Sequence, residues 1–342
     1  MPQVLGWIYF GLLSAVVLIL PVEPSFVHNW TQFYAYNAIY FFPALIGIAA
    51  FGYLFNDWCD IESDTEAGKP NRLAKLPAAF QLVIVAIPFL IGVGAWIMLN
   101  WMAYMVLIPM RFANILFTLQ VLSLVIYSAK PFRLKERAGL GAICDAFYGH
   151  LNPVLITLSV FEVMPRTGHW RPSVIFLLII VCSIKGIRNI LLHQIEDRKK
   201  DSTSKINTVV LKYGPWRVIN FINHYLFPAE IFFLVCLMLV ISIHIPPLLI
   251  PVILFAIVSY LKFSGWKLGY ADRRLVEFKF SYFMNDYYEG WLPVFMLIIL
   301  SVYRHEFVFL LILHLIVFPM FIIKLVRDFK AIRENFKTEE DY

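Results

Sequence analysis

The sequence NDWCDIESDTEAGKPNR, residues 56–72, follows a long apolar run and holds four acidic residues within eight positions. Asn56, Asp60 and Asp64 are spaced four residues apart, so on a helix all three lie on one face. Negative charge of this density beside a membrane span is costly unless a cation neutralises it. Oxygen ligands favour Mg2+, so the stretch predicts a magnesium site at a helix end.

A second stretch, HQIEDRKKD at residues 193–201, has the same period and also follows an apolar run. Its residues His193, Asp197 and Asp201 again fall on one helix face. Both acidic faces have the same spacing, and each lies at the end of a predicted membrane helix. Together they predict two metal-binding walls of a single pocket. The alternative for either motif is a solvated helix end whose acids pair with loop lysines. The predicted metal ligands are Asn56, Asp60, Asp64, Asp197 and Asp201.

The composition is that of a membrane protein. The chain has 342 residues, 60% of them hydrophobic, with a mean hydropathy of +0.73. Apolar runs of roughly 17–25 residues are long enough to cross ~30 Å of hydrocarbon. We therefore expect one integral-membrane domain over residues 1–342, folded as an all-α, polytopic helix bundle. The predicted spans lie near residues 4–20, 35–56, 79–98, 104–128, 142–163, 172–194, 219–242, 246–264, 286–303 and 305–325.

The last two predicted spans are separated only by Arg304, His305 and Glu306, so they require a tight hairpin. The alternative is that one of the final four segments is re-entrant or lies along the membrane surface. Most Lys and Arg residues fall in loops on one side of the predicted spans, the same side as both acidic motifs. The positive-inside rule therefore predicts a cell inner-membrane protein whose site faces the cytoplasm, and the net charge of +6 does not indicate a nucleic-acid partner.

The sequence resembles the UbiA superfamily of intramembrane prenyltransferases. Its first acidic stretch matches the family's NxxxDxxxD motif, and Asp197 with Asp201 matches the second, DxxxD. YSAKPFRLKERAGLG, residues 127–141, is similar to the family's basic loop after the fourth helix. The second motif departs from the pattern, because it lacks the usual following glycine and has His193 in place of an acid. The family usually has nine helices, so the resemblance implies nine or ten transmembrane helices around a central cavity.

The resemblance implies Mg2+-dependent transfer of a prenyl group from an allylic (poly)prenyl diphosphate to an acceptor, most often aromatic, with release of pyrophosphate. The implied catalytic residues are Asp60, Asp64, Asp197 and Asp201. Arg and Lys make charge-assisted bonds to phosphate oxygens, although basic loops also arise from membrane topology alone. The candidate diphosphate-binding residues are Asn56, Lys69, Arg72, Tyr127, Lys130, Arg133, Lys135, Lys185 and Arg188.

Several polar residues lie inside apolar runs, where charge is expensive and usually functional. Lys185 and Arg188 precede His193 in the sixth run, and they are expected either to face the pocket or to extend toward the cytoplasmic surface. Asp145 lies in the fifth run with Tyr148, His150 and Asn152. This group could orient an acceptor, and helix–helix hydrogen bonding is the structural alternative.

Two other functions remain open from the sequence. A terpene cyclase would use the same ionising site, with the cation captured by the donor's own double bonds. A polytopic transporter is compatible with charged residues inside the spans, but transporters place coupled charges near the midplane, whereas the acids here cluster at helix ends. The expected partners are an isoprenoid diphosphate donor, an aromatic or other lipophilic acceptor, and the lipid bilayer.

Overall fold

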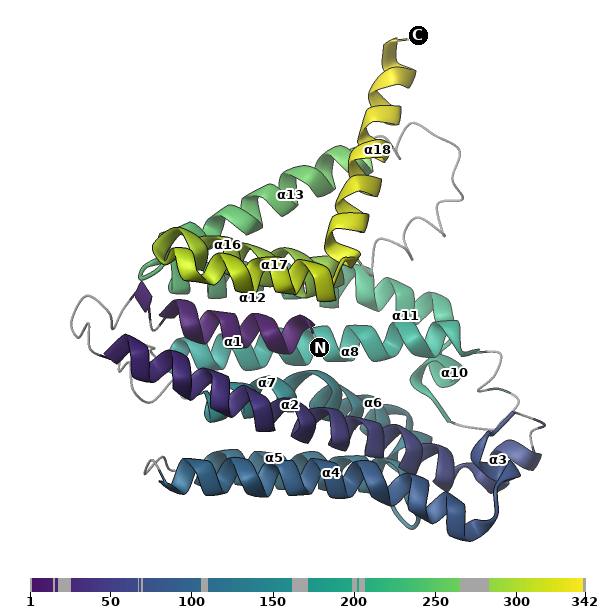
Figure 1. Ribbon diagram of the computed structural model, residues 1–342. Helices are drawn as coiled ribbons and strands as arrows, with labels where there is room; N and C mark the ends of the chain where they lie inside the picture. The colour runs from purple at the N-terminus through teal and green to yellow at the C-terminus, as the bar shows by residue number, and fades with distance from the viewer. Residues whose placement is uncertain are drawn as a thin grey trace. The chain divides into compact units, whose positions relative to one another are not determined.

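The protein is described by a computed structural model (Figure 1), and every regular element in its described residues is helical. One isolated parallel β-bridge joins Ala138, the first residue of a helix, to Thr208, which precedes another helix. The described residues are 2–14, 16–17, 26–66, 68, 70–105, 110–161, 172–198, 202, 207–264 and 283–340.

The chain forms two compact units. The first, which we call the motif unit, consists of residues 25–162 and 179–226 and contains both acidic motifs. Its helices are α2 (Phe26–Cys59), α3 (Ile61–Glu66), η2 (Leu73–Lys75), α4 (Ala78–Met105), α5 (Arg111–Ser128), η3 (Leu134–Glu136), α6 (Ala138–Ala146), the π-helix η4 (Phe147–Leu151), α7 (Asn152–Val160), the C-terminal part of α8 (Pro172–Glu196), α10 (Val209–Tyr213), α11 (Pro215–Phe221) and the π-helix η5 (Ile222–Leu226).

The second unit consists of residues 1–24, 163–178 and 227–342. Arg304 alone separates α16 from η9, so the structure contains the predicted tight hairpin. Within this unit, the Tyr9 hydroxyl lies 3.0 Å from His314 Nδ1 and joins α1 to α17. Its helices are α1 (Pro2–Ser14), the N-terminal part of α8, α12 (Phe227–Ser242), η6 (Pro246–Leu248), α13 (Leu249–Ser264), α15 (Phe283–Asp286), the π-helix η8 (Tyr287–Trp291), α16 (Leu292–Tyr303), η9 (His305–Phe307), α17 (Val308–Val317) and α18 (Met320–Glu340).

Fewer helices than expected can cross a membrane by themselves. Among the described residues, five are long and apolar enough, and a sixth span results if the bent pair α17–α18 counts as one. The nine or ten spans of the prediction are therefore not confirmed. The five are Ala35–Cys59, Ala78–Met105, Arg111–Ser128, Pro172–Glu196 and Pro215–Ser242.

Length and continuity explain the difference in span number. Within the described residues, Val4–Ser14 and Pro246–Leu261 are apolar but short, and at about 1.5 Å per residue neither described stretch covers ~30 Å of hydrocarbon. The run at 142–163 forms α6, a π-helix and α7, and it is not among the five candidate spans. The last run bends by 73° between Val317 and Met320, as a broken span or a re-entrant loop does.

Within the motif unit, α2 packs along α4 at a backbone-to-backbone crossing. A Cβ atom added to Gly47 would lie 2.6 Å from the Gly92 nitrogen and 2.7 Å from the Pro88 carbonyl oxygen. Only glycine permits this approach, because rigid backbone atoms cannot move aside as a flexible side chain can. The crossing therefore sets the position of α2, the helix that carries the first acidic motif.

We expect Gly47→Ala to lower stability by about 1–3 kcal/mol, the usual cost of overpacking a tight contact. Gly94→Ala in α4 is the matched control, because a Cβ there meets nothing within 4 Å. That control is expected to be neutral or to stabilise by about 0.5–1 kcal/mol, since alanine is the better helix former. Thermal unfolding in detergent measures both, and equal melting temperatures would contradict the tight crossing.

Candidate active site

The first acidic motif begins on the last turn of α2 and continues into α3. Asp60 marks the break between the two helices, but its amide still donates to the Asn56 carbonyl oxygen at 3.1 Å. The Asp64 amide in turn donates to the Asp60 carbonyl oxygen at 2.8 Å. These bonds span four residues each, so the helical spacing predicted for Asn56, Asp60 and Asp64 persists across the break.

Lys135, from the basic loop, binds the side chains of the motif directly. Its ammonium nitrogen lies 2.5 Å from each carboxylate oxygen of Asp60 and 2.7 Å from Asn56 Oδ1. The Lys135 side chain is only 8% exposed. Burial lowers the pKa of the Lys135 ammonium, and the Asp60 carboxylate opposes part of that shift by favouring the charged form.

Arg133 is the second cation of this cluster. Its Nη2 donates to Asp60 Oδ1 at 2.8 Å and to Ser63 Oγ at 3.1 Å, while its Nε lies 2.7 Å from Glu136. The backbone of Arg133 is left-handed, with φ of 38°, a conformation uncommon outside glycine. Two of the three basic residues predicted in the loop therefore converge on one carboxylate of the first motif.

Ser128 and Asn71 are contacts that sequence reasoning missed. The Ser128 hydroxyl donates to Asn56 Oδ1 at 3.1 Å, and Asn71 Nδ2 donates to Asp64 Oδ2 at 3.0 Å. Asn71 also binds the Asp57 carbonyl oxygen at 2.8 Å, which fixes the loop after α3 against the end of α2. Both residues adjoin positions that the analysis did select, Tyr127 and Arg72, but nothing in their type alone marked them.

Two predicted phosphate-binding residues lie at the surface instead. Arg72 is exposed, and the exposed Lys130 lies 3.6 Å from the carboxylate of Glu62. Surface pairs of this kind contribute little to stability, because solvent screens them. Lys69 lies outside the described residues.

The end of α8, which carries the second motif, is attached to the basic loop. Gln194 Oε1 accepts a hydrogen bond from the Val209 amide at 3.1 Å, and the neighbouring Thr208 forms the β-bridge with Ala138. Ala138 begins α6 directly after that loop. Figure 1 accordingly shows α3, α10 and the C-terminal end of α8 at the same end of the motif unit.

Asp197 lies just beyond α8, and its amide donates to the His193 carbonyl oxygen at 2.9 Å. The exposed His193 ring lies 3.6 Å from Glu196. Asp201 lies outside the described residues. The structure thus brings Asp197 to the end of the motif unit that holds Asp60, and the role of Asp201 stays a prediction.

Lys185 and Arg188 are fully buried in α8, with 0% of either residue exposed. They do not extend to the surface, which was one of the two expectations for them. Their helix packs closely on the end of α6, because a Cβ added to the adjacent Gly186 would lie 2.8 Å from Cβ of Ala146.

The polar residues of the fifth run divide between two kinds of contact. The Tyr148 hydroxyl donates to Asp145 Oδ1 at 2.5 Å, and the Tyr148 and Tyr127 rings meet edge to face at 5.2 Å between centroids. Asn152 instead donates to Gln120 Oε1 at 2.8 Å and joins η4–α7 to α5. For Asn152, helix–helix hydrogen bonding is therefore the observed role.

The oxygen atoms of Asn56 and Asp60 converge on one point, the position that the Lys135 ammonium holds. In the described part of the chain, no three His, Cys, Asp or Glu side chains group closely enough to hold a metal ion alone. Mg2+ does not require such a group, since it commonly binds one or two carboxylates and completes its shell with water and phosphate oxygens. The oxygen-only cradle of Asn56 and Asp60 fits that ion.

A model of the UbiA prenyltransferase family matches residues 12–286, which include both acidic motifs and the basic loop. The chain belongs to the UbiA prenyltransferase family. Comparison of this UbiA family chain with curated proteins gives no match. Among solved structures it is similar to a UbiA homolog from Archaeoglobus fulgidus bound to DMAPP and Mg2+, with 13% identity over 88% of this chain and 98% of that one, at a TM-score of 0.49.

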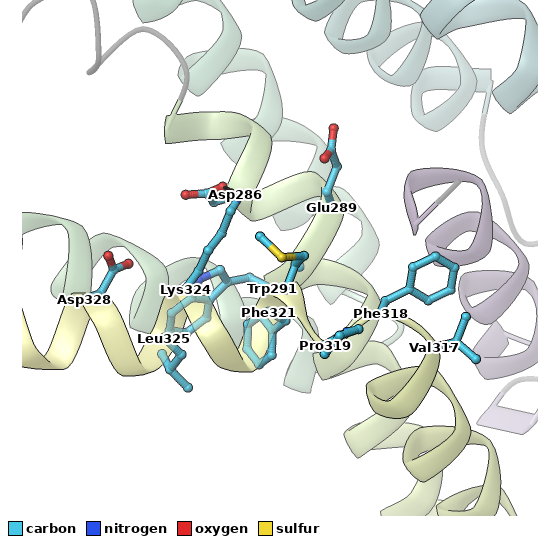
Figure 2. Close-up of a pocket in the computed structure, with 12 residues that line it drawn as sticks. Asp286, Glu289, Trp291, Val317, Phe318, Pro319, Phe321, Lys324, Leu325 and Asp328 are labelled. Atoms are coloured by element: carbon cyan, nitrogen blue, oxygen red, sulfur yellow. Dashed lines mark hydrogen bonds and ion pairs between the residues drawn. The ribbon is translucent and has the colours of Figure 1, made fainter.

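The second unit of this UbiA family protein contains a cavity of about 350 Å3 (Figure 2). Its walls come from the π-helix η8 and from the bend between α17 and α18, and include Trp291, Phe318 and Phe321. Lys324 forms an ion pair with Asp286 in the lining. The described residues of the two acidic motifs are not part of its lining.

Proposed function

We propose that this UbiA family protein transfers a prenyl group from an allylic diphosphate to a lipophilic acceptor in the membrane, most simply an aromatic ring, and releases pyrophosphate. One observation carries the proposal: Asn56 and Asp60 present oxygen ligands at the end of a membrane helix, and Lys135 and Arg133 meet them there. A diphosphate bound through a metal ion needs this pairing of oxygen ligands with cationic donors.

Each residue of the cluster has a distinct task in this proposal. Mg2+, when bound, would neutralise the negative charge that develops on the departing pyrophosphate. Asp60 and Asn56 would hold the ion on the first wall, and Asp64 would extend that wall. Lys135 and Arg133 would donate N–H groups to the diphosphate oxygens, where fixed donors stabilise developing charge without reorganising.

The second wall would consist of Asp197 and Asp201. The connection from Gln194 through Thr208 and Ala138 to the basic loop supports this arrangement, because it ties the end of α8 to the loop that binds Asp60. The apolar helices of the motif unit would surround the prenyl chain, and the site would face the cytoplasm, as the positive-inside rule favours.

The test is a turnover assay with protein reconstituted in vesicles, Mg2+ and allylic diphosphates of several chain lengths. We expect pyrophosphate release that depends on an aromatic acceptor, stops on addition of EDTA and returns with Mg2+. Product mass identifies the donor and the acceptor. Pyrophosphate release without any acceptor would indicate a cyclase on the same site, and no release with any donor would contradict the proposal.

A further inference from the structure

The Lys135 ammonium occupies a cation site built by the first motif. Lysine has three N–H donors and no acceptor, and Lys135 has three oxygens within hydrogen-bonding distance: both carboxylate oxygens of Asp60 and Oδ1 of Asn56. The Ser128 hydroxyl donates to the same Asn56 Oδ1 at 3.1 Å. The Lys135 side chain is only 8% exposed, and all three of its N–H donors have an oxygen partner. The ammonium is therefore bound specifically by Asn56 and Asp60, and does not lie near an acid by chance.

The same three oxygens are those that would bind Mg2+ in the proposed function. An ion bound at about 2.0–2.1 Å to these atoms would lie where the ammonium now lies. Two cations cannot share that point, because like charges a few ångströms apart repel strongly at low effective dielectric. Metal binding therefore requires Lys135 to leave.

We propose that Lys135 is an internal substitute for the metal ion. Before the substrate arrives, the Lys135 ammonium holds Asp60 and Asn56 in place, and when the ion binds, the ammonium moves to the diphosphate. The inference rests on the proposed function of this site. Arg133 makes the exchange feasible, because it remains bound to Asp60 Oδ1 and to Ser63 after Lys135 departs. The carboxylate is thus never left without a partner, a state that is costly when buried.

The exchange affects two binding affinities in opposite directions: it weakens the binding of a divalent cation and strengthens the binding of the diphosphate. Without a diphosphate, Lys135 competes with the ion, so the wild-type site binds a divalent cation more weakly than its oxygens alone would. With a diphosphate, Lys135 contributes N–H donors to the phosphate oxygens, so it strengthens substrate binding. A lysine with a merely structural role would not produce effects in opposite directions.

The first experiment uses unaltered protein in detergent and follows reductive methylation of lysine amines by mass spectrometry. Lys75, an exposed lysine of η2, is the reference. Without divalent ions we expect Lys135 to react about tenfold or more slowly than Lys75, because burial and three hydrogen bonds protect the amine. Saturating Mg2+ alone should raise the Lys135 rate several-fold and leave Lys75 unchanged. A Lys135 rate that stays constant or falls would overturn the proposal.

The second experiment compares Lys135→Met with Lys75→Met by Mn2+ binding, detected by electron paramagnetic resonance, and by pyrophosphate binding. Methionine keeps the length of the side chain and removes its charge. We expect Lys135→Met to bind Mn2+ about tenfold or more tightly without pyrophosphate, since the competing charge is gone, and to bind pyrophosphate more weakly. Lys75→Met should match the wild type in both.

The two proposals fail differently in these measurements. Wild-type protein that binds neither Mn2+ nor pyrophosphate would contradict the proposed function and the lysine exchange together. Wild-type protein that binds both, combined with a Lys135→Met variant that binds Mn2+ no more tightly, would overturn the exchange alone.

Discussion

Replacing Asp60 by asparagine is expected to lower prenyl-transfer turnover by about 10²–10³-fold, the usual cost of removing one electrostatic contact to the transition state. Asparagine keeps the shape of the side chain and removes the charge that would hold the metal ion. The loss should lie in kcat more than in KM, because the developing charge on pyrophosphate is greatest in the transition state. Turnover under saturating donor measures it.

Glu62→Gln is the matched control for Asp60→Asn. Glu62 is an acid of the same short stretch, but its side chain is exposed and pairs only at 3.6 Å with Lys130. We expect near wild-type turnover for it, since exposed pairs of this kind have small energies. Thermal unfolding of both variants separates lost chemistry from lost folding. Full activity in a folded Asp60→Asn protein would remove Asp60 from the mechanism.

Replacing Asp197 by asparagine is expected to reduce turnover by a similar factor, about 10²–10³-fold, if the second motif is the other metal-binding wall. The double variant with Asp60→Asn should lose less than the product of the two single losses, because carboxylates that hold one metal–diphosphate unit act together. Glu196→Gln, beside Asp197 and near His193, is the control. Multiplicative losses in the double variant would mean that the two motifs act independently.

Wild-type turnover in Asp197→Asn would have a different meaning. The second motif is the one that departs from the family pattern, with His193 at its first position and no glycine after its last acid. Unchanged activity would leave the first wall, with Lys135 and Arg133, as the whole ionising site.

Local spacing allowed the shared helical face of the first motif to be predicted from the sequence. The four-residue period of Asn56, Asp60 and Asp64 is a property of the helix itself, so it survives in the structure even across the break at Asp60. The basic loop was also identified, and Arg133 and Lys135 were among its candidate residues, but so was Lys130. Arg133 and Lys135 meet Asp60, whereas Lys130 pairs with Glu62 at the surface, and only the folded loop decides between them.

The number of spans could not be predicted for a different physical reason. Hydropathy measures composition, whereas crossing a membrane requires a continuous helix of sufficient length. The bend between Val317 and Met320 interrupts one apolar run. This bend does not change the hydropathy of the run, so the sequence profile cannot detect it.

The crossing of α2 and α4 at Gly47 also fixes the rotation of α2 about its own axis. Gly47 is held against the Gly92 backbone, and Asn56 follows on the same helix, so the rotation of the acidic face about the α2 axis is set by the number of residues between them. One residue gained or lost in that interval would turn the face by about 100°, away from Lys135, without altering a single ligand. The number of residues between Gly47 and Asn56 therefore fixes the direction in which the acidic face points, as well as its distance from the crossing. Among related chains, we expect insertions and deletions in this segment to come only in whole helical turns.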